Sequence, residues 1–262
     1  MSEPAHRADS SGVAWLGRNL TPQPFAGDHG DADSVIAEAL RSWFAAPAAE
    51  QWQREADVVN ALAGRRLLVG VIPVPGQGQP SPDHLRGDAS ADLAVAIVAG
   101  PGGRALPVFT STDILLAWDG AARPVPVEAE RAALAAVAEQ CDELLVDADD
   151  PAQFRLCRPA LWALAHGRWW VTPAMDGQVV AAVQRATAEV SASQPHLRSA
   201  HCQGEPWGGL VVVVRLAVGL DQAGLTRVTT ALGMALGRDP VITERVQGLR
   251  LVIRSAPATM AQ

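Results

Sequence analysis

Apolar residues recur along the chain with spacings that predict alternating helices and strands from about residue 31 onward. Between residues 35 and 43, and again between 48 and 62, they return every three or four positions, which is typical of amphipathic helices. A continuous apolar run over 67–74 follows and predicts a buried strand. The start of the chain lacks this periodicity and is rich in Pro, Gly, Asp and Ser, so we expect residues 1–30 to form a flexible tail.

The next elements complete a first domain. Residues 93–110 have apolar runs on both sides of the glycine-rich turn at 100–103, which predicts a hairpin whose second strand leads into a helix over 112–118. The remaining elements expected here are a strand at 124–127, a helix at 128–140, strands at 143–148 and 154–157, and a helix at 159–166. This order predicts a mixed α/β domain over residues 31–167.

A smaller and different pattern begins after Gly167. It predicts a strand at 169–172, a helix at 177–191, strands at 197–203 and 210–218, a helix at 221–236 and a strand at 249–254. The order βαββαβ is that of ferredoxin-like domains, in which two helices cover one face of the sheet. We therefore expect a ferredoxin-like α+β domain over residues 168–256, and the fold class of the whole chain is α/β.

The stretch 105–118, ALPVFTSTDILLAW, resembles the signature of the N-terminal domain of the SseB family in its actinobacterial form, where an LPxFTS strand leads into a helix that ends near Trp. Further segments similar to this family, in the same order, are 33–43, 62–74, 89–95, 100–105, 123–127 and 144–147. Gly70 stands where relatives tend to carry Pro, and glycine there weakens the strand or permits a close backbone approach. The resemblance covers roughly residues 30–167 and implies a non-catalytic protein of undefined molecular role.

Charge and residue usage exclude several classes of function. The formal net charge is −7 and the pI is about 5.3, with the basic residues scattered among acids, so we expect no nucleic-acid partner. All 21 basic residues are arginine. The absence of lysine excludes a Schiff-base amine, a Walker lysine and a lysine general base.

Cysteine usage and hydropathy indicate the compartment. The three cysteines form no CxxC pair, which argues against a disulfide framework and a zinc knuckle and favours a reducing environment. No apolar core follows a basic start, and the longest apolar run, at 210–214, is far too short to span a bilayer. We therefore expect a cytoplasmic protein with no membrane contact and no cofactor.

No metal site is expected either. His196, His201 and Cys202 are the nearest approach to a ligand cluster, but positions 196 and 201 of one strand point to opposite faces of a sheet. The acidic run 147–150 could chelate a hard cation, yet acids between a strand and a proline commonly form an Asx turn. The turn is the favoured interpretation.

Four polar residues define a hypothetical ligand site. Thr110, Ser111, Asp113 and Asp147 lie at the ends of predicted strands, where ligands usually collect in α/β sheets. Ser111 could act as a nucleophile, but no histidine is close in sequence to serve as its base. A Ser or Thr at a strand-to-helix junction more often caps the helix by accepting a hydrogen bond from one of its first N–H groups.

Tryptophan usage favours an interaction role. Trp207 lies between Pro206 and Gly208 in a predicted hairpin loop, where a large ring is hard to bury and indicates recognition. In the pair Trp169 and Trp170, neighbouring strand residues face opposite sides, so one ring can enter a core while the other is exposed. We interpret Trp170 either as an interdomain packing residue or as an anchor for a partner.

Two functions therefore remain open. The first is a non-catalytic interaction or regulatory protein that offers its sheet edges, Trp207 and Trp170 to an unidentified protein partner. The second is a small-molecule-binding protein or weak hydrolase with its site near residues 110–113 and Asp147, for which a converging base is not found in the sequence.

Overall fold

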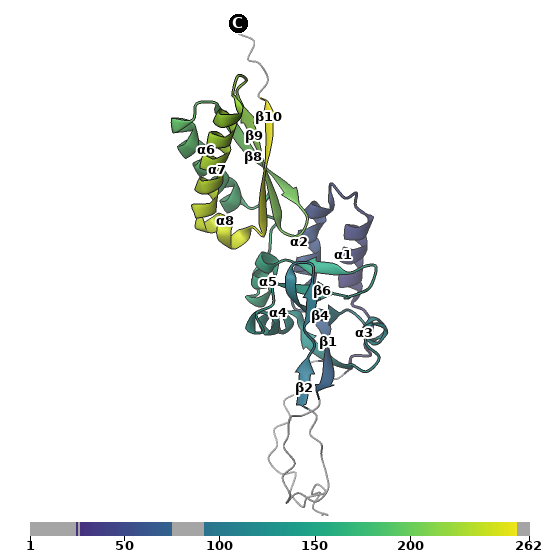
Figure 1. The fold of residues 1–262 in the computed structure, drawn as a ribbon. Helices are drawn as coiled ribbons and strands as arrows, with labels where there is room; N and C mark the ends of the chain where they lie inside the picture. The colour runs from purple at the N-terminus through teal and green to yellow at the C-terminus, as the bar shows by residue number, and fades with distance from the viewer. Residues whose placement is uncertain (1–24, 26, 75–91, 256–262) are drawn as a thin grey trace, which may run out of the picture.

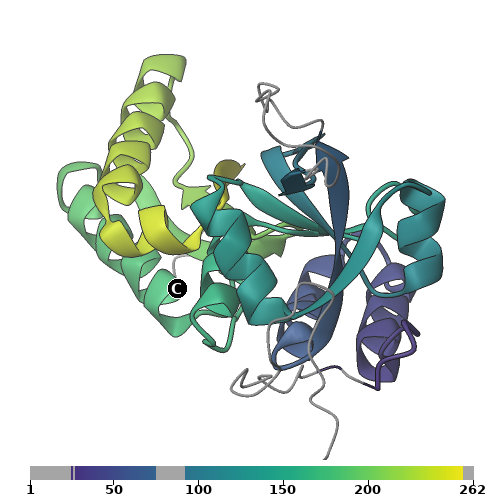
Figure 2. The ribbon, with the colours of Figure 1, turned by 90° about the horizontal axis from the view of Figure 1, so that it is seen from below.

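The computed structural model of the chain describes residues 25, 27–74 and 92–255, which form two groups of elements with separate hydrophobic cores (Figure 1). The expected flexible tail over residues 1–30 lies almost wholly outside the described residues. Figure 2 shows the second group, green to yellow, beside the first, purple to teal. Among the described helices, none is both long enough and apolar enough to cross a membrane.

The first group is built on a mixed sheet. Its strands are β1 (Arg66–Val74), β2 (Asp92–Val95), β3 (Val98–Gly100), β4 (Gly103–Phe109), β5 (Arg123–Glu128), β6 (Glu143–Val146) and β7 (Phe154–Leu156). The strand order is β2-β1-β4-β6-β7, while β3 pairs with β4 and β5 pairs with β1. β4 and β6 are parallel, and the other pairs are antiparallel. The carboxyl ends of β4 and β6 therefore lie at the same edge of the sheet.

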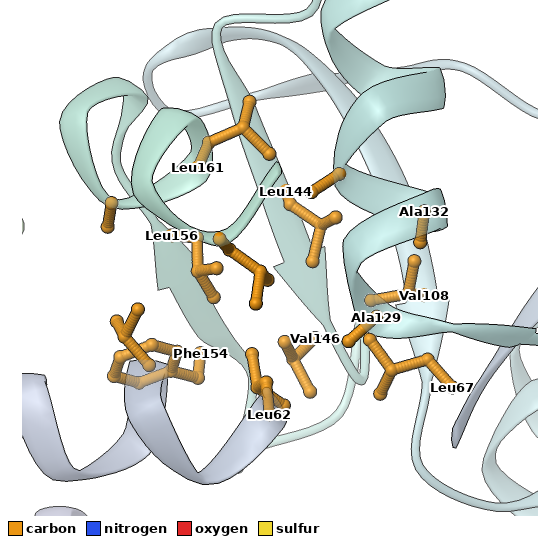
Figure 3. Packing of buried hydrophobic residues seen from close by; sticks show 14 of the residues in the cluster. Leu62, Leu67, Val108, Ala129, Ala132, Leu144, Val146, Phe154, Leu156 and Leu161 are labelled. Atoms are coloured by element: carbon orange, nitrogen blue, oxygen red, sulfur yellow. The ribbon is translucent and has the colours of Figure 1, made fainter. Parts of the chain in front are cut away.

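Helices cover both faces of this sheet. The helices on one face are α1 (Ser34–Ala45), α2 (Gln51–Leu62), α4 (Ala129–Ala138) and α5 (Arg158–Ala165), which share one apolar cluster with the strands. Figure 3 shows the centre of this cluster, where Leu62, Leu144 and Phe154 lie between helices and sheet. On the opposite face α3 (Thr112–Trp118) packs over a smaller cluster that contains Phe109 and Leu115. The first group is thus a three-layered α/β domain.

Gly70 lies in β1 where α3 packs on the strand. A Cβ atom at this position would be 3.3 Å from the Trp118 ring and 3.5 Å from the Ala122 Cβ atom. The glycine thus permits α3 and the turn after it to approach the strand closely, which is one of the two roles expected from the sequence.

The second group is a small sheet with its helices on one face. Its elements are α6 (Gly177–Ser193), β8 (Leu197–Glu205), β9 (Gly209–Leu216), α7 (Gln222–Arg238), α8 (Pro240–Arg245) and β10 (Gly248–Ser255). The strand order is β10-β9-β8, with β8 antiparallel and β10 parallel to β9. Val183, Val212 and Leu232 lie in the core between helices and sheet. The other face of this sheet carries no helix from the described part of the chain.

The prediction of a ferredoxin-like domain is wrong in its first strand. Residues 169–172 form no strand, so among the described residues the second sheet has three strands, and β10 pairs directly with β9. The cause is a competing partner in α2. The Trp170 N–H donates to Asn60 Oδ1 at 2.9 Å, and Asn60 Nδ2 donates to the Trp170 carbonyl at 2.9 Å. A side-chain amide thus takes the place of a neighbouring strand and holds this segment to the first core.

Candidate functional site

The structure brings Thr110 and Asp147 together at the shared carboxyl edge of β4 and β6. Asp147 Oδ1 accepts a hydrogen bond from the Thr110 N–H at 2.7 Å, and the Thr110 hydroxyl donates to Oδ2 at 2.9 Å. Both residues are buried, and this burial raises the pKa of the Asp147 carboxyl above its ordinary value, although the two hydrogen bonds oppose the shift. The polar groups of this pair are satisfied by each other, which is the arrangement of a structural contact.

Ser111 and Asp113 have roles at the start of α3. Ser111 is the N-cap, and its Oγ accepts a hydrogen bond from the Ile114 N–H at 3.3 Å, which confirms the capping interpretation. Asp113 is exposed in the first turn, where a negative charge favours the helix. Asp150 Oδ1 accepts from the Ala152 N–H at 2.7 Å and forms the expected Asx turn. The described residues contain no cluster of three His, Cys, Asp or Glu side chains that could hold a metal ion.

Replacing Ser111 with alanine is expected to lower the free energy of unfolding by about 1 kcal/mol, because the first turn of α3 loses its side-chain acceptor. Urea denaturation measures this change. Ser111→Gly serves as the control, since glycine at an N-cap costs only a few tenths of a kcal/mol. If the Ser111→Ala variant kept its stability but no longer bound a ligand or no longer showed an enzymatic activity, the ligand-site hypothesis would be favoured instead.

Replacing Asp147 with alanine is expected to cost about 2 kcal/mol, because it leaves the buried N–H and hydroxyl of Thr110 without their acceptor. Asp147 also has a φ of 54°, a left-handed conformation that Asn adopts more readily than Ala. Asp147→Asn keeps one carbonyl oxygen and is therefore expected to cost less than the alanine variant. Urea denaturation of both variants tests this order, and equal losses would contradict it.

Trp207 lies at the tip of the hairpin between β8 and β9, and its ring packs on the first core. The ring centroid is 4.9 Å from that of Trp43 and 5.5 Å from that of Phe154. The Arg155 guanidinium lies 5.4 Å from the ring centroid on its face, in a cation–π contact. Trp207 remains half-buried, and its role as a partner anchor stays a prediction.

Glu55 in α2 holds the backbone of the same hairpin tip. Its side chain is buried, and Oε2 accepts hydrogen bonds from the N–H groups of Trp207 at 2.9 Å and Gly208 at 3.3 Å. Within the described residues, Oε1 of this carboxyl has no hydrogen-bond partner. Burial raises the pKa of Glu55 to about 8, and the two N–H groups and the positive charge of Arg155 only partly oppose this effect.

We call the surface of the first domain that receives the hairpin tip, formed by Trp43, Trp52, Glu55, Phe154 and Cys157, the hairpin socket. Two glycines show how closely the hairpin fits it. A Cβ atom on Gly208 would lie 2.5 Å from the Cys157 Sγ atom, and one on Gly204 would overlap the Trp52 ring. Gly208 also has a φ of 68°, which favours glycine for a second reason. Glu55 was not expected from the sequence, although its position as an acid on the apolar face of a predicted helix is a signal that such a residue has a buried partner.

A groove lies where α5, the segment after it and α8 meet. We call it the Trp169 groove; it has a volume of about 1050 Å³ and is lined mainly by Arg158, Trp162, His166, Arg168, Trp169 and Arg245. Trp169 is 78% exposed and Trp162 is 39% exposed, whereas the neighbouring Trp170 is 5% exposed in the first core. The His166 ring stacks on Trp162 with centroids 5.3 Å apart. One ring of the pair at 169–170 is thus buried and the other exposed, although not through the alternation of a strand, because this segment forms none.

The Trp169 groove is lined by three arginines, Arg158, Arg168 and Arg245, and by two acids, Asp176 and Glu244, so its net charge is only slightly positive. Arg245 is paired with Asp176 at 2.8 Å, and Arg158 makes a longer contact of 3.4 Å with Asp142. Arg168 forms no ion pair with any residue in the described parts of the chain. The groove therefore combines exposed indole rings with one arginine, Arg168, that has no ionic partner among the described residues.

The chain has two parts: a three-layered α/β domain, and after it a smaller α+β unit. The tip of the β8–β9 hairpin in the second part packs on the first. Residues 37–163 match the family model described as the SseB protein N-terminal domain. The first domain is therefore an SseB N-terminal domain, in agreement with the resemblance carried by the stretch 105–118. Searches of curated proteins and of solved structures returned no match.

Proposed function

We propose that this chain, which carries an SseB N-terminal domain, is a non-catalytic cytoplasmic interaction protein and that the Trp169 groove binds its protein partner. The observation that carries the proposal is the exposure of two indole rings, Trp169 and Trp162, in one groove. Neighbouring exposed rings are characteristic of interaction sites, and Trp and Arg side chains dominate the binding energy of protein interfaces.

The groove fits an acidic partner segment that carries a large apolar side chain. The two indole rings provide flat apolar contact area, which suits an aromatic or leucine side chain. Arg168 and Arg158 lie in the same groove and suit carboxylates on either side of that apolar group. A basic partner segment would meet the like charge of Arg168 there.

The cytoplasmic part of the proposal is supported by the state of the cysteines. Cys141, Cys157 and Cys202 are all free, and the first two are buried. A chain that keeps its thiols unpaired suits a reducing compartment.

The test uses the indole N–H signals of the eight tryptophans in a two-dimensional NMR spectrum. Two short synthetic peptides serve as probes: one has glutamates around a central Trp-Leu pair, and the other has lysine in place of each glutamate. We expect the acidic peptide to shift the signals of Trp169 and Trp162 while the signal of Trp43, which is buried, stays unchanged. Trp169→Ala is expected to weaken binding about tenfold or more.

Charge variants make the result specific. Arg168→Glu is expected to weaken binding of the acidic peptide, whereas Arg131→Glu, at an exposed position of α4, serves as a control that leaves it unchanged. Equal binding of the two peptides, or no shift of Trp169 and Trp162, would contradict the proposal. Shifts confined to Trp207 would assign the partner contact to the hairpin tip instead.

The alternative function, a small-molecule-binding protein or weak hydrolase near residues 110–113 and Asp147, stays a prediction. Its residues are engaged in the Thr110–Asp147 contact and in the cap of α3, and no observation favours it beyond their proximity. The Ser111→Ala measurement described above distinguishes it from the interaction function.

A further inference from the structure

The second sheet exposes a face and an edge that the Trp169 groove does not include. The open face is the side of this sheet opposite its helices, and a shallow hollow of about 600 Å³ lies on it. The residues lining the hollow are His201, Gln203, Val211, Val213, Arg215, Arg250, Val252, Arg254 and Ser255. β10 is the outer strand here and runs away from the first domain, as Figure 1 shows in yellow.

The charges on the open face are unbalanced at one end. Arg254 of β10 lies directly opposite Arg215 of β9 in the strand register, and both side chains are exposed. Like charges in this arrangement repel each other. Arg250 is paired with Glu205 at 2.6 Å, but neither Arg215 nor Arg254 forms an ion pair within residues 27–74 and 92–255. In a chain with a net charge of −7, this pair of unneutralised arginines favours an acidic ligand.

The outer edge of β10 has the properties of a strand-addition site. β10 is eight residues long and pairs with β9 on one side, and no described strand pairs with it on the other. Its sequence, GLRLVIRS, contains no proline, and its two charged residues, Arg250 and Arg254, lie on the open face and leave the helix side of the edge apolar. Ile253 is 40% exposed on the side of β10 that faces the helices. An extended segment can therefore find both free backbone groups and apolar contact along this edge.

We propose that the outer edge of β10 accepts an extended segment of a protein partner as a fourth strand, and that this segment alternates acidic with apolar residues. Alternate side chains of an added strand point to opposite faces of the sheet. On the open face its acidic residues lie next to Arg254. Their negative charge offsets the repulsion between Arg254 and Arg215. On the helix side its apolar residues cover Leu251 and Ile253.

Other occupants fit this edge less well. A second copy paired through β10 would add two more arginines, Arg250 and Arg254 of the second copy, to a face that already has an excess of positive charge. A single-stranded nucleic acid requires aromatic platforms for its bases, and no Trp or Phe lines the hollow. The chain's own segment 169–172 is tied to α2 through the backbone of Trp170, which pairs with Asn60. An acidic strand from a partner is the occupant that the charges favour.

The experiment uses the full chain and three labelled eight-residue peptides, which match the length of β10. The first alternates glutamate and valine, the second has the same composition in two blocks, and the third alternates lysine and valine. Fluorescence anisotropy gives the affinities, and backbone amide shifts locate the site. We expect the alternating acidic peptide to bind with shifts in β10, and the block peptide to bind roughly tenfold or more weakly, because it cannot present acids to one face only.

Charge reversal provides the decisive variant. Arg254→Glu is expected to lower the affinity for the alternating acidic peptide by roughly tenfold to a hundredfold and to raise the affinity for the lysine peptide. Arg227→Glu, at an exposed position of α7, is the matched control and is expected to change neither. Because Arg254 is exposed, the variant is expected to fold normally, and a urea denaturation curve checks this. Trp169→Ala should leave these affinities unchanged, so this proposal and the groove proposal fail independently.

Three outcomes would overturn the proposal. Equal affinity for the alternating and block peptides would show that binding depends on peptide charge alone and not on pairing with β10. A higher affinity for a labelled oligothymidylate than for the acidic peptide would assign the face to nucleic acid. Self-association in analytical ultracentrifugation that is abolished by Ile253→Lys would assign the edge to a second copy of the chain.

Discussion

Replacing Trp207 with alanine is expected to lower the free energy of unfolding by about 3 kcal/mol and to uncouple the hairpin from the first domain. The ring packs against Trp43 and Phe154, so its removal leaves a cavity at the junction of the two parts of the chain. The cation–π contact with Arg155 is lost at the same time. Urea denaturation followed by tryptophan fluorescence and by circular dichroism measures both effects, because uncoupled parts unfold in separate transitions.

The matched control for this variant is Trp169→Ala. It removes the same side chain from a position that is 78% exposed and is expected to change stability by no more than about 0.5 kcal/mol. Similar losses for the two variants would contradict the role assigned to the Trp207 ring, since burial in the socket is the property that separates them.

The stability of the chain is expected to fall as pH rises from about 4.5 to about 8, and Glu55 is expected to be a main cause. Burial raises the pKa of this carboxyl from 4.5 to about 8, so the folded chain keeps a proton that the unfolded chain releases in this range. The stabilising contribution of the protonated group is complete below pH 4.5 and is lost as pH passes 8. The integrated change from this one group is on the order of 4 kcal/mol.

The Glu55→Gln variant tests this prediction. Its side-chain oxygen can still accept the N–H groups of Trp207 and Gly208, but the side chain does not ionise. The difference in unfolding free energy between the variant and the natural chain is therefore expected to grow in favour of the variant as pH rises. Histidines also titrate in this range, but they are common to both proteins and cancel in the difference. The exposed Glu38→Gln serves as the control, and a Glu55→Gln variant with an unchanged pH slope would disprove the assignment.

The elements with a regular apolar period were predictable from the sequence. The strand expected at 67–74 corresponds to β1, and the helices expected at 177–191 and 221–236 correspond closely to α6 and α7. The strand expected at 169–172 failed for a reason that no local pattern contains. Of its apolar residues, Trp170 is buried in the first core, and the backbone of Trp170 pairs with the side chain of Asn60, which lies 110 residues earlier in the chain.

The candidate sites were predictable to a similar degree. The meeting of Thr110 and Asp147 follows from parallel neighbouring strands, and the cap at Ser111 follows from a Ser at a strand-to-helix junction. The Trp169 groove was not predictable, because it depends on how α5 and α8 approach each other. The position of Glu55 on an apolar helix face was visible in the sequence, but its partners were not predictable, because they are backbone N–H groups of a hairpin more than 150 residues away.

The hairpin socket limits how this architecture can diversify by recombination. A gene fusion that joined the first domain to an unrelated C-terminal unit would leave the Glu55 carboxyl without the N–H donors of Trp207 and Gly208. It would also leave the surface around Trp52 without the glycine backbone that fits against it. Chimeras between relatives are therefore expected to fold well only when α2 and the β8–β9 hairpin come from the same parent, so we expect these two distant segments to be inherited together.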